Sequence, residues 1–350
     1  MTATEARIAV YGAGAMGTVL GALLTLGGLN NVELITRNKA HVAGLNDTGA
    51  RIDCIAEEKE LTIRVCAKTP EEMSGKYDVV FLMTKQKSNA EILRFLSPFL
   101  HEESVVCTTQ NGLPEPSVAE IVGAHRTYGG VASFGATFVG GGKVQLTSKT
   151  DGMRMQVAGY QNDNSKVELL TKILAYAGRA IENPDFSQAT ENLSGARWSK
   201  LAINAAFSGL SVVTGCTFGE IAKQGKSKKI ALGILRECMD VANALGVRLE
   251  PMQGHDMQKM LGGRGFFKTR LALLLLPIAM KKHKNLVSGM RKDVENGKKC
   301  EIDFINGGVC KAGKEVGVAT PLCDKVVEIV HGIENGLYET SYQNVDFFEI

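Results

Sequence analysis

The 350-residue sequence predicts an α/β protein, with a doubly wound parallel sheet on the N-terminal side and an all-helical domain after it. Three observations lead to this prediction. Strand and helix patterns alternate through the first half, a glycine-rich loop joins the first strand to the first helix, and the pattern after Pro184 is helical almost to the end. We therefore predict two domains, residues 1–183 and residues 184–350.

The first half contains apolar runs that alternate with helical patterns. Continuous apolar runs indicate strands that are covered on both faces, as in a parallel sheet. Strands are expected at residues 7–12, 31–36, 77–85 and 104–112, and helices at residues 15–28 and 88–100. Residues 51–67 alternate around a polar middle and predict an antiparallel excursion, while residues 126–160 predict short strands joined by hairpins.

Composition and charge exclude several classes of protein. The chain is 44% hydrophobic and 22% charged, and its net charge is only +3, so we expect neither nucleic acid nor membrane lipid as a partner. None of the eight cysteines forms a CxxC pair or clusters with histidines, which predicts reduced thiols and no metal site. The first residues lack the pattern of a signal peptide, so a cytoplasmic location is expected.

The longest apolar run is "LALLLLPIAM", residues 271–280. It is about half the roughly 20 residues that a bilayer span needs, and Pro277 interrupts it. A buried helix is the main expectation. The alternatives are a lid over a ligand site, a subunit contact as in a homodimer, and, less favoured, a surface membrane anchor.

The stretch "GAGAMG", residues 12–17, follows the first strand and opens a helix. In this context GxGxxG predicts a Rossmann-type dinucleotide site. Gly12 allows the tight turn, Gly14 lets the backbone approach a pyrophosphate, and Gly17 lets the helix pack on the strand. The alternative is a purely structural turn. The cofactor-binding residues expected here are Gly12, Ala13, Gly14, Ala15, Met16 and Gly17.

The end of the second strand, "ITRNK", indicates which dinucleotide is bound. An NAD site usually ends this strand with an acid that binds the ribose 2′-hydroxyl, but Glu33 lies too early, in the strand interior. Arg37 and Lys39 stand where a 2′-phosphate would lie, and the arginine fork matches a phosphate. We therefore predict NADP(H), with Arg37 as a solvated turn residue as the alternative.

Two further strand ends are expected at the same site. Ligands of open parallel sheets bind beyond the carboxyl ends of the strands. Lys85 lies at the end of the strand at 77–85, and Gln110, Asn111 and Gly112 lie at the end of the strand at 104–112. We predict that Lys85 and Asn111 contact the cofactor, although Asn-Gly also favours a simple turn.

The segment "RWSKLAINAAFSGLSVV", residues 197–213, predicts a buried helix with one polar seam. With Lys200 at zero and about 100° per residue, Asn204, Ser208 and Ser211 fall at about 40°, 80° and 20°. Apolar residues occupy most of the remaining circumference. A buried lysine needs a polar cleft or an acid, and a lowered pKa would suit it to proton transfer. A structural ion pair is the alternative.

The same projection separates two acids at residues 300–316. Ile302, Ile305 and Val309 define an apolar stripe, and Glu301 lies at its edge. Asp303 points the other way and is expected in solvent or in a cap. Glu301 is therefore the acid that can face an interior lysine.

These residues resemble the ketopantoate reductase (2-dehydropantoate 2-reductase) family. The motifs run in the family's order: "GAGAMG" at 12–17, "TK" at 84–85, "QNG" at 110–112, "RWSKLAIN" at 197–204, "GEI" at 219–221 and "KCEIDFING" at 299–307, followed by "GVATP". The resemblance implies a Rossmann domain, a helical domain, an active site in the cleft between them, and reduction of a 2-oxo acid with NADPH.

The resemblance also implies roles for individual residues. Lys200 matches the catalytic lysine, and Glu301 matches the active-site glutamate. Asn111 and Asn204 match site asparagines that position nicotinamide, ribose or substrate. Arg37 and Lys85 match cofactor-binding positions.

The sequence departs from the family at three positions near the substrate. Ser208 stands where a second asparagine is common, and Phe218 where a polar residue is frequent. Gly289 stands where a substrate-binding serine is usual, with Ser288 one step before it. A less polar pocket would suit a 2-oxo acid with a more apolar tail.

We therefore expect an oxidoreductase that reduces ketopantoate to pantoate, a step of pantothenate biosynthesis. The expected substrate-binding residues are Asn111, Asn204, Ser208 and Ser288. One alternative is a D-2-hydroxyacid dehydrogenase of the same fold that acts on branched-chain 2-oxo acids. The other is a module that binds NADPH without catalysis.

Overall fold

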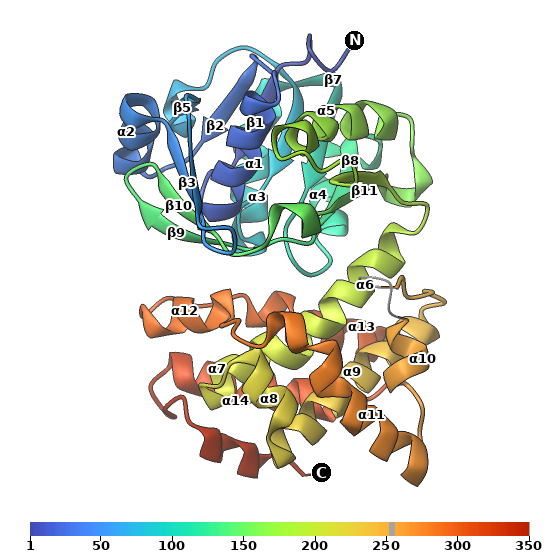
Figure 1. Ribbon diagram of the computed structural model, residues 1–350. Helices are drawn as coiled ribbons and strands as arrows, with labels where there is room; N and C mark the ends of the chain where they lie inside the picture. Colours follow the sequence, from blue (N-terminus) through green and yellow to red (C-terminus); the bar gives the residue numbers. More distant parts are fainter. Residues whose placement is uncertain (252–255, 350) are drawn as a thin grey trace. The chain divides into compact units, whose positions relative to one another are not determined.

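The computed structural model describes residues 1–251 and 256–349, and contacts divide the chain into two compact units (Figure 1). The first unit comprises Met1–Gln110 and Pro114–Leu193. The second comprises Asn111–Leu113 and Ser194–Ile350.

The first unit contains an eight-stranded sheet in the order β12-β11-β8-β7-β6-β1-β2-β5. Neighbouring strands from β5 to β8 are parallel, whereas β11 is antiparallel to β8. The strand order reverses beside β1, which is where open α/β sheets bind ligands. The bounds are β1 (Ile8–Tyr11), β2 (Val32–Ile35), β5 (Cys66–Lys68), β6 (Tyr77–Leu82), β7 (Leu100–Thr108), β8 (Thr127–Ala132), β11 (Met155–Gly159) and β12 (Ser187–Ala189).

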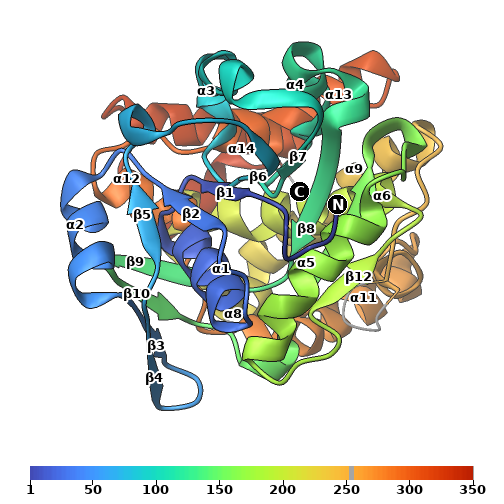
Figure 2. The same cartoon turned by 90° about the horizontal axis from the view of Figure 1, so that it is seen from above.

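Helices cover both faces of this sheet. Figure 2 shows α1 (Ala15–Leu26) and α5 (Val167–Ala180) on one side, and α3 (Asn89–Leu96) and α4 (Glu115–Val122) on the other. Successive residues of β1 alternate between the two cores: Ile8 and Val10 pack with α1 and α5, whereas Ala9 and Tyr11 pack with α3 and α4. The predicted doubly wound sheet is thus confirmed.

A second sheet of four strands has the order β4-β3-β10-β9. It contains β3 (Ala50–Cys54), β4 (Lys59–Ile63), β9 (Ala136–Gly140) and β10 (Lys143–Leu146), and α2 (Lys39–Thr48) precedes it in the chain. The β3–β4 hairpin confirms the antiparallel excursion predicted for residues 51–67. The pairing of β10 with β3 is parallel and joins segments about ninety residues apart, so local sequence patterns do not reveal it.

The described part of the second unit contains helices and turns only, as predicted. Its first helix changes character along its length: α6 (Leu193–Ile203) leads into a π turn at Asn204–Gly209 and then into α7 (Leu210–Thr214). The other helices are α8 (Phe218–Lys223), α9 (Gly225–Ala244), α10 (Met257–Leu261), α11 (Phe266–Ala279), α12 (Gly289–Glu295), α13 (Asn306–Glu315) and α14 (Pro321–Glu334).

Helix α11 corrects the expectation that residues 271–280 are simply buried. Ala272 and Leu276 are buried, but Leu271, Leu274 and Ile278 are exposed by 55, 69 and 67%. One side of the helix packs on the core of its unit, and the other side is apolar and uncovered. None of the helices in the described ranges is long and apolar enough to cross a membrane.

Candidate active site

The glycine-rich loop has the geometry that a pyrophosphate needs. Gly12 has a φ of +102°, and a Cβ there would lie 2.7 Å from the backbone of Met83, at the end of β6. A Cβ on Gly17 would clash with the carbonyl oxygen of Gly12, so helix and loop require glycine at both positions. Beside Gly14 the space is open, because a Cβ there would meet no atom within 4 Å. The loop therefore fits a dinucleotide whose phosphates approach the start of α1.

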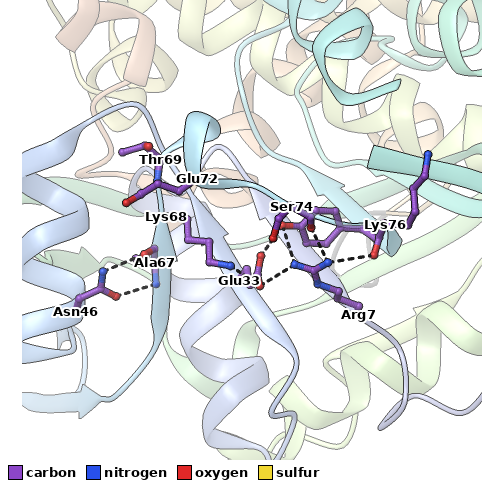
Figure 3. Close-up of polar contacts among 10 residues, drawn as sticks. Arg7, Glu33, Asn46, Ala67, Lys68, Thr69, Glu72, Ser74 and Lys76 are labelled. Carbon is purple, nitrogen blue, oxygen red and sulfur yellow. Dashed lines mark hydrogen bonds and ion pairs between the residues drawn. The ribbon is translucent and has the colours of Figure 1, made fainter. Parts of the chain in front are cut away.

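Glu33 lies inside β2, as predicted, and its carboxylate is engaged by other side chains. Its carboxylate accepts hydrogen bonds from Lys68 Nζ at 2.8 Å, from Arg7 at 3.1 Å and from the Tyr77 hydroxyl (Figure 3). Burial alone would raise the pKa of Glu33, but the bonds from Lys68, Tyr77 and Arg7 hold that pKa below its usual value. These bonds occupy the one acid of β2 that a ribose could otherwise have used.

Arg37 lies two residues beyond β2, and its side chain is exposed. Burial raises the pKa of Tyr11 at the end of β1, and the Arg37 guanidinium acts against that rise. The Arg37 guanidinium is thus close enough to the end of β1 to interact electrostatically with the Tyr11 hydroxyl. Lys39 opens α2 and is also exposed. Both cations lie beyond the carboxyl end of β2, where a 2′-phosphate was predicted.

Lys85 follows β6 and is partly exposed. The neighbouring loops are held by Gln110, which is 4% exposed. Its amide donates to Asn89 Oδ1 at 2.6 Å and to Thr84 Oγ1 at 3.3 Å, and Asn89 donates back at 3.1 Å. This network joins the loop after β6 to the loop after β7. Asn111, which follows Gln110, is exposed and clusters with the second unit.

The polar seam of α6 is present in part. Lys200, Asn204 and Ser208 are partly exposed, while their helical neighbours Leu201, Ala205 and Phe207 are buried. Ser211, which the projection also placed in the seam, is fully buried, and its hydroxyl donates to the Cys216 carbonyl at 2.8 Å.

The π turn explains the difference at Ser211. A π hydrogen bond spans five residues rather than four, so the turn holds one extra residue. Every residue after it is rotated by about 100° relative to an unbroken α-helix. Ser211 is thereby turned into the core, whereas Ser208, inside the turn, is carried back toward the direction of Lys200.

Lys200 has the perturbed acidity expected of a proton-transfer residue. Desolvation is the main cause and, with the Arg197 guanidinium, lowers the pKa of Lys200 from 10.5 to about 7. The Glu301 carboxylate acts in the opposite direction. Lys200 and Glu301 therefore interact electrostatically, as the projection of the two helices predicted.

Glu301 lies ahead of a short 3₁₀ turn, Ile302–Phe304, and not within a continuous helix. The chain breaks at Ile305, with φ −100° and ψ −88°, before α13 begins. Despite this break, Ile302 and Asp303 face the sides that the projection predicted. Ile302 is buried, whereas the Asp303 side chain is 63% exposed and pairs with His331 at 2.9 Å.

The region of predicted substrate residues is built around the N-terminus of α12. Ser288 is 1% exposed; its hydroxyl accepts from Arg291 N at 3.0 Å and donates to the Ser208 carbonyl at 3.2 Å. Gly289 is exposed, and a Cβ there would meet no atom within 4 Å. Phe218 is buried, with its ring centroid 5.5 Å from that of Phe207.

Sequence reasoning missed two residues of this region. Arg197 is 2% exposed and acts on Lys200. Projected from Lys200 it falls at about 60°, inside the predicted seam, so the signal was present. Asn306 is 0% exposed and contacts the π turn through a hydrogen bond to Ala205. This contact of Asn306 results from tertiary packing, so no local sequence pattern reveals it. No cluster of three or more metal-binding side chains was found among the described residues.

Two family models match the chain. One, described as Ketopantoate reductase PanE/ApbA, matches residues 8–158, and the other, described as Ketopantoate reductase PanE/ApbA C terminal, matches residues 192–334. A 2-dehydropantoate 2-reductase of Mesorhizobium japonicum is 26% identical, over 95% of this chain and 99% of the relative.

Solved structures share the fold at lower identity. D-mandelate dehydrogenase, solved with NADH and anilino(oxo)acetate, has a TM-score of 0.78 and 23% identity, over 94% of this chain and 99% of the other. A PanE/ApbA family ketopantoate reductase from Ralstonia eutropha has a TM-score of 0.76 and 23% identity over the same shares. A dimeric ketopantoate reductase from Staphylococcus aureus has a TM-score of 0.71 and 16% identity, over 95% and 99%.

The family models span most of the chain, and the dinucleotide loop and the Lys200–Glu301 pair lie within the matched segments. The predicted enzyme class and the predicted use of a nicotinamide cofactor are thereby confirmed. The chain belongs to the ketopantoate reductase family and is an oxidoreductase that uses a nicotinamide cofactor.

Proposed function

We propose that the protein reduces a 2-oxo acid to a 2-hydroxy acid with NADPH, and that 2-dehydropantoate (ketopantoate) is the acid. One observation carries this proposal. Lys200 lies on a largely buried helix, with its pKa lowered to about 7 and with Glu301 acting on it. A lysine of that acidity gives up a proton readily near neutral pH, which reduction of a carbonyl requires.

The chemistry assigns Lys200 the proton. When bound, the reduced nicotinamide supplies the hydride to C2 of the oxo acid. As the C=O π electrons move onto the carbonyl oxygen, the Lys200 ammonium stabilises the developing alkoxide and donates a proton from Nζ to it. The neutral amine then regains a proton from solvent. Glu301 would orient the ammonium or a substrate hydroxyl.

The remaining site residues are assigned to binding. Asn111 and Asn204 would position nicotinamide, ribose or substrate, and Ser208 is a further candidate for substrate. Ser288 is proposed for substrate as well, although its hydroxyl already holds the Ser208 carbonyl. The cofactor would be held by the loop Gly12–Gly17 and by Arg37 and Lys85.

Preference for NADPH over NADH rests on the end of β2. Glu33 is bonded to Lys68 and Arg7, and no other acid lies in β2. Arg37 and Lys39 instead offer positive charge beyond the strand, which suits a 2′-phosphate.

The substrate choice has a specific rival. The relative from M. japonicum is named 2-dehydropantoate 2-reductase, which supports ketopantoate. D-mandelate dehydrogenase shares the fold, and here Phe218 and Gly289 replace polar family residues, so a branched-chain or other apolar 2-oxo acid is the second candidate. Steady-state reduction of ketopantoate, 2-oxoisovalerate and 2-oxoisocaproate, each with NADPH and NADH, distinguishes the two.

We expect ketopantoate with NADPH to have the highest kcat/KM of the panel. If ketopantoate is the poorest of the three acids, the rival substrate class replaces it. If NADPH binds but no 2-oxo acid is reduced, the protein is a non-catalytic NADPH-binding module.

A homodimer through α11 is the proposed assembly, in the cytoplasm, where the free cysteines would stay reduced. Phe267, Leu271, Leu274 and Ile278 are all more than half exposed and follow one another at intervals of four, three and four residues. That spacing is the seam of a helix that packs against another helix, and a ketopantoate reductase of the same fold is described as dimeric.

Light scattering after size exclusion tests the dimer. We expect a dimer for the parent protein and a monomer for Leu274→Glu. Leu245→Glu, which adds the same charge at an exposed leucine outside α11, should stay dimeric. A monomeric parent protein would contradict the assignment.

A further inference from the structure

A buried side chain from α13 donates a hydrogen bond to the π turn in the helix that carries Lys200. Asn306 is the first residue of α13 and is 0% exposed. Its Nδ2 donates to the carbonyl oxygen of Ala205 at 3.1 Å. Ala205 directly follows Asn204, the first residue of the π turn. A π turn inside an α-helix frequently marks a functional site, and here a buried amide bonds to its backbone.

Gly209, the last residue of the turn, makes room for the other half of the Asn306 carboxamide. A Cβ at Gly209 would lie 2.7 Å from Asn306 Oδ1. Within the described ranges, Oδ1 has no hydrogen-bond partner. The donor Nδ2 is therefore the half of the amide that acts on the turn. An apolar replacement of similar size removes that bond and leaves no new buried polar atom on residue 306.

The same segment carries Glu301. Only the turn Ile302–Phe304 and Ile305 separate Glu301 from Asn306, and Ile305 N donates to the Glu301 carbonyl at 3.1 Å. The bond from Asn306 to Ala205 thus links the segment of Glu301 to the helix of Lys200 across 101 residues of sequence.

We propose that Asn306 is a positioning residue for the reduction: its bond to Ala205 ties the segment that carries Glu301 to the helix that carries Lys200. The catalytic part of this inference rests on the proposed function. If the bond is lost, the segment that begins at Glu301 is no longer tied to that helix. The Glu301 carboxylate then moves away from Lys200 and no longer favours its charged form.

A matched control exists on the same helix. Asn344 is 7% exposed, and its Nδ2 donates to the Val213 carbonyl at 2.9 Å, in α7 beyond the π turn. Asn306→Leu and Asn344→Leu each remove one buried amide donor to the same helix, and Asn344→Leu also removes a bond from Nδ2 to the Glu339 carbonyl at 2.8 Å. Both should lower the melting temperature. Only Asn306→Leu should lower kcat, by at least tenfold, with the affinity for NADPH unchanged.

A second readout needs no substrate. The rate at which an acylating reagent modifies Lys200, followed by mass spectrometry across pH, reports its titration. In Asn306→Leu the midpoint should fall below about 7, because the Glu301 carboxylate no longer supports the charged form of Lys200. In Asn344→Leu the midpoint should stay. If Asn306→Leu does not fold, Asn306→Ala removes the same donor without filling the site.

The two proposals fail in different ways. A folded Asn306 variant with an unchanged Lys200 midpoint overturns the positioning role, even if the parent protein reduces a 2-oxo acid. Equal losses of kcat in the Asn306 and Asn344 variants overturn it too. A parent protein that reduces no 2-oxo acid contradicts the proposed function, while a midpoint that moves only in the Asn306 variant still supports the role of Asn306 in positioning the segment of Glu301.

Discussion

The Glu301 carboxylate raises the pKa of Lys200, but desolvation and the Arg197 guanidinium outweigh it and leave that pKa at about 7. The lysine is therefore balanced between its charged and neutral forms near neutral pH. Such a group can lose and regain a proton within one turnover.

Removal of the lysine tests its role directly. Lys200→Ala should lower kcat by roughly two to four orders of magnitude, because the alkoxide loses both its proton donor and its stabilising charge. The affinity for NADPH, measured by fluorescence titration, should remain within about threefold. Near-normal turnover in this variant would rule out Lys200 as the proton donor.

The pH dependence of reduction follows from the same group. The protonated form of Lys200 is the active acid, so kcat/KM for reduction should be high below pH 7 and fall as pH rises through about 7. Glu301→Gln removes the effect that raises this pKa, so the fall should move to lower pH. A profile that stays unchanged in Glu301→Gln would show that Glu301 does not act on the titrating group.

Cofactor preference should depend on Arg37. Arg37→Asp replaces the cation beyond β2 with an acid that repels a 2′-phosphate and can bind a ribose hydroxyl. We expect KM for NADPH to rise by at least tenfold, with a smaller change for NADH. Lys59→Asp, which makes the same change of charge at an exposed lysine of β4, serves as the comparison. Equal effects of the two substitutions on NADPH would show a general charge effect.

The space at Gly289 allows a test of substrate selection. Gly289 does not have a positive φ, and a Cβ there would contact nothing, so Gly289→Ser should fold normally. A hydroxyl at this family position should raise kcat/KM for ketopantoate relative to 2-oxoisocaproate by about two- to tenfold, the value of one hydrogen bond. Gly289→Ala supplies the Cβ without the hydroxyl and should leave the ratio unchanged. The same ratio in both variants would place residue 289 outside the substrate pocket.

Glu237 should contribute to stability without a part in the chemistry. It is 8% exposed, and its carboxylate accepts from the backbone N–H groups of Leu322 at 2.8 Å and Cys323 at 2.9 Å, at the start of α14. Glu237→Ala leaves both donors unsatisfied and should cost about 2–5 kcal/mol of unfolding free energy. Glu237→Gln keeps one acceptor oxygen and should cost less, as urea unfolding can measure. Equal losses of unfolding free energy in the two variants would mean that the hydrogen bonds to Leu322 and Cys323 do not account for the effect of Glu237→Ala.

Several features of the molecule could be predicted because they are local. The glycine loop follows from the steric demands of one turn, and the parallel sheet from apolar runs that alternate with helices. The seam of Lys200, Asn204 and Ser208 follows from helical periodicity within nine residues. The different orientations of Glu301 and Asp303 were predicted correctly because the apolar residues that define the buried stripe lie within about two helical turns of them.

Other features depend on contacts between distant residues. The bond from Asn306 to Ala205 at the π turn joins positions 101 residues apart, and the rotation at that turn is why Ser211 is buried against expectation. The apolar run at residues 271–280, most of which lies in α11, indicated burial, but the tertiary structure covers only one side of it. The sequence by itself was enough to predict the cofactor loop and to single out Lys200 and Glu301 as the candidate catalytic pair. The tertiary structure alone decided that Arg197 and desolvation lower the pKa of Lys200, because electrostatic energy depends on distances that only packing sets.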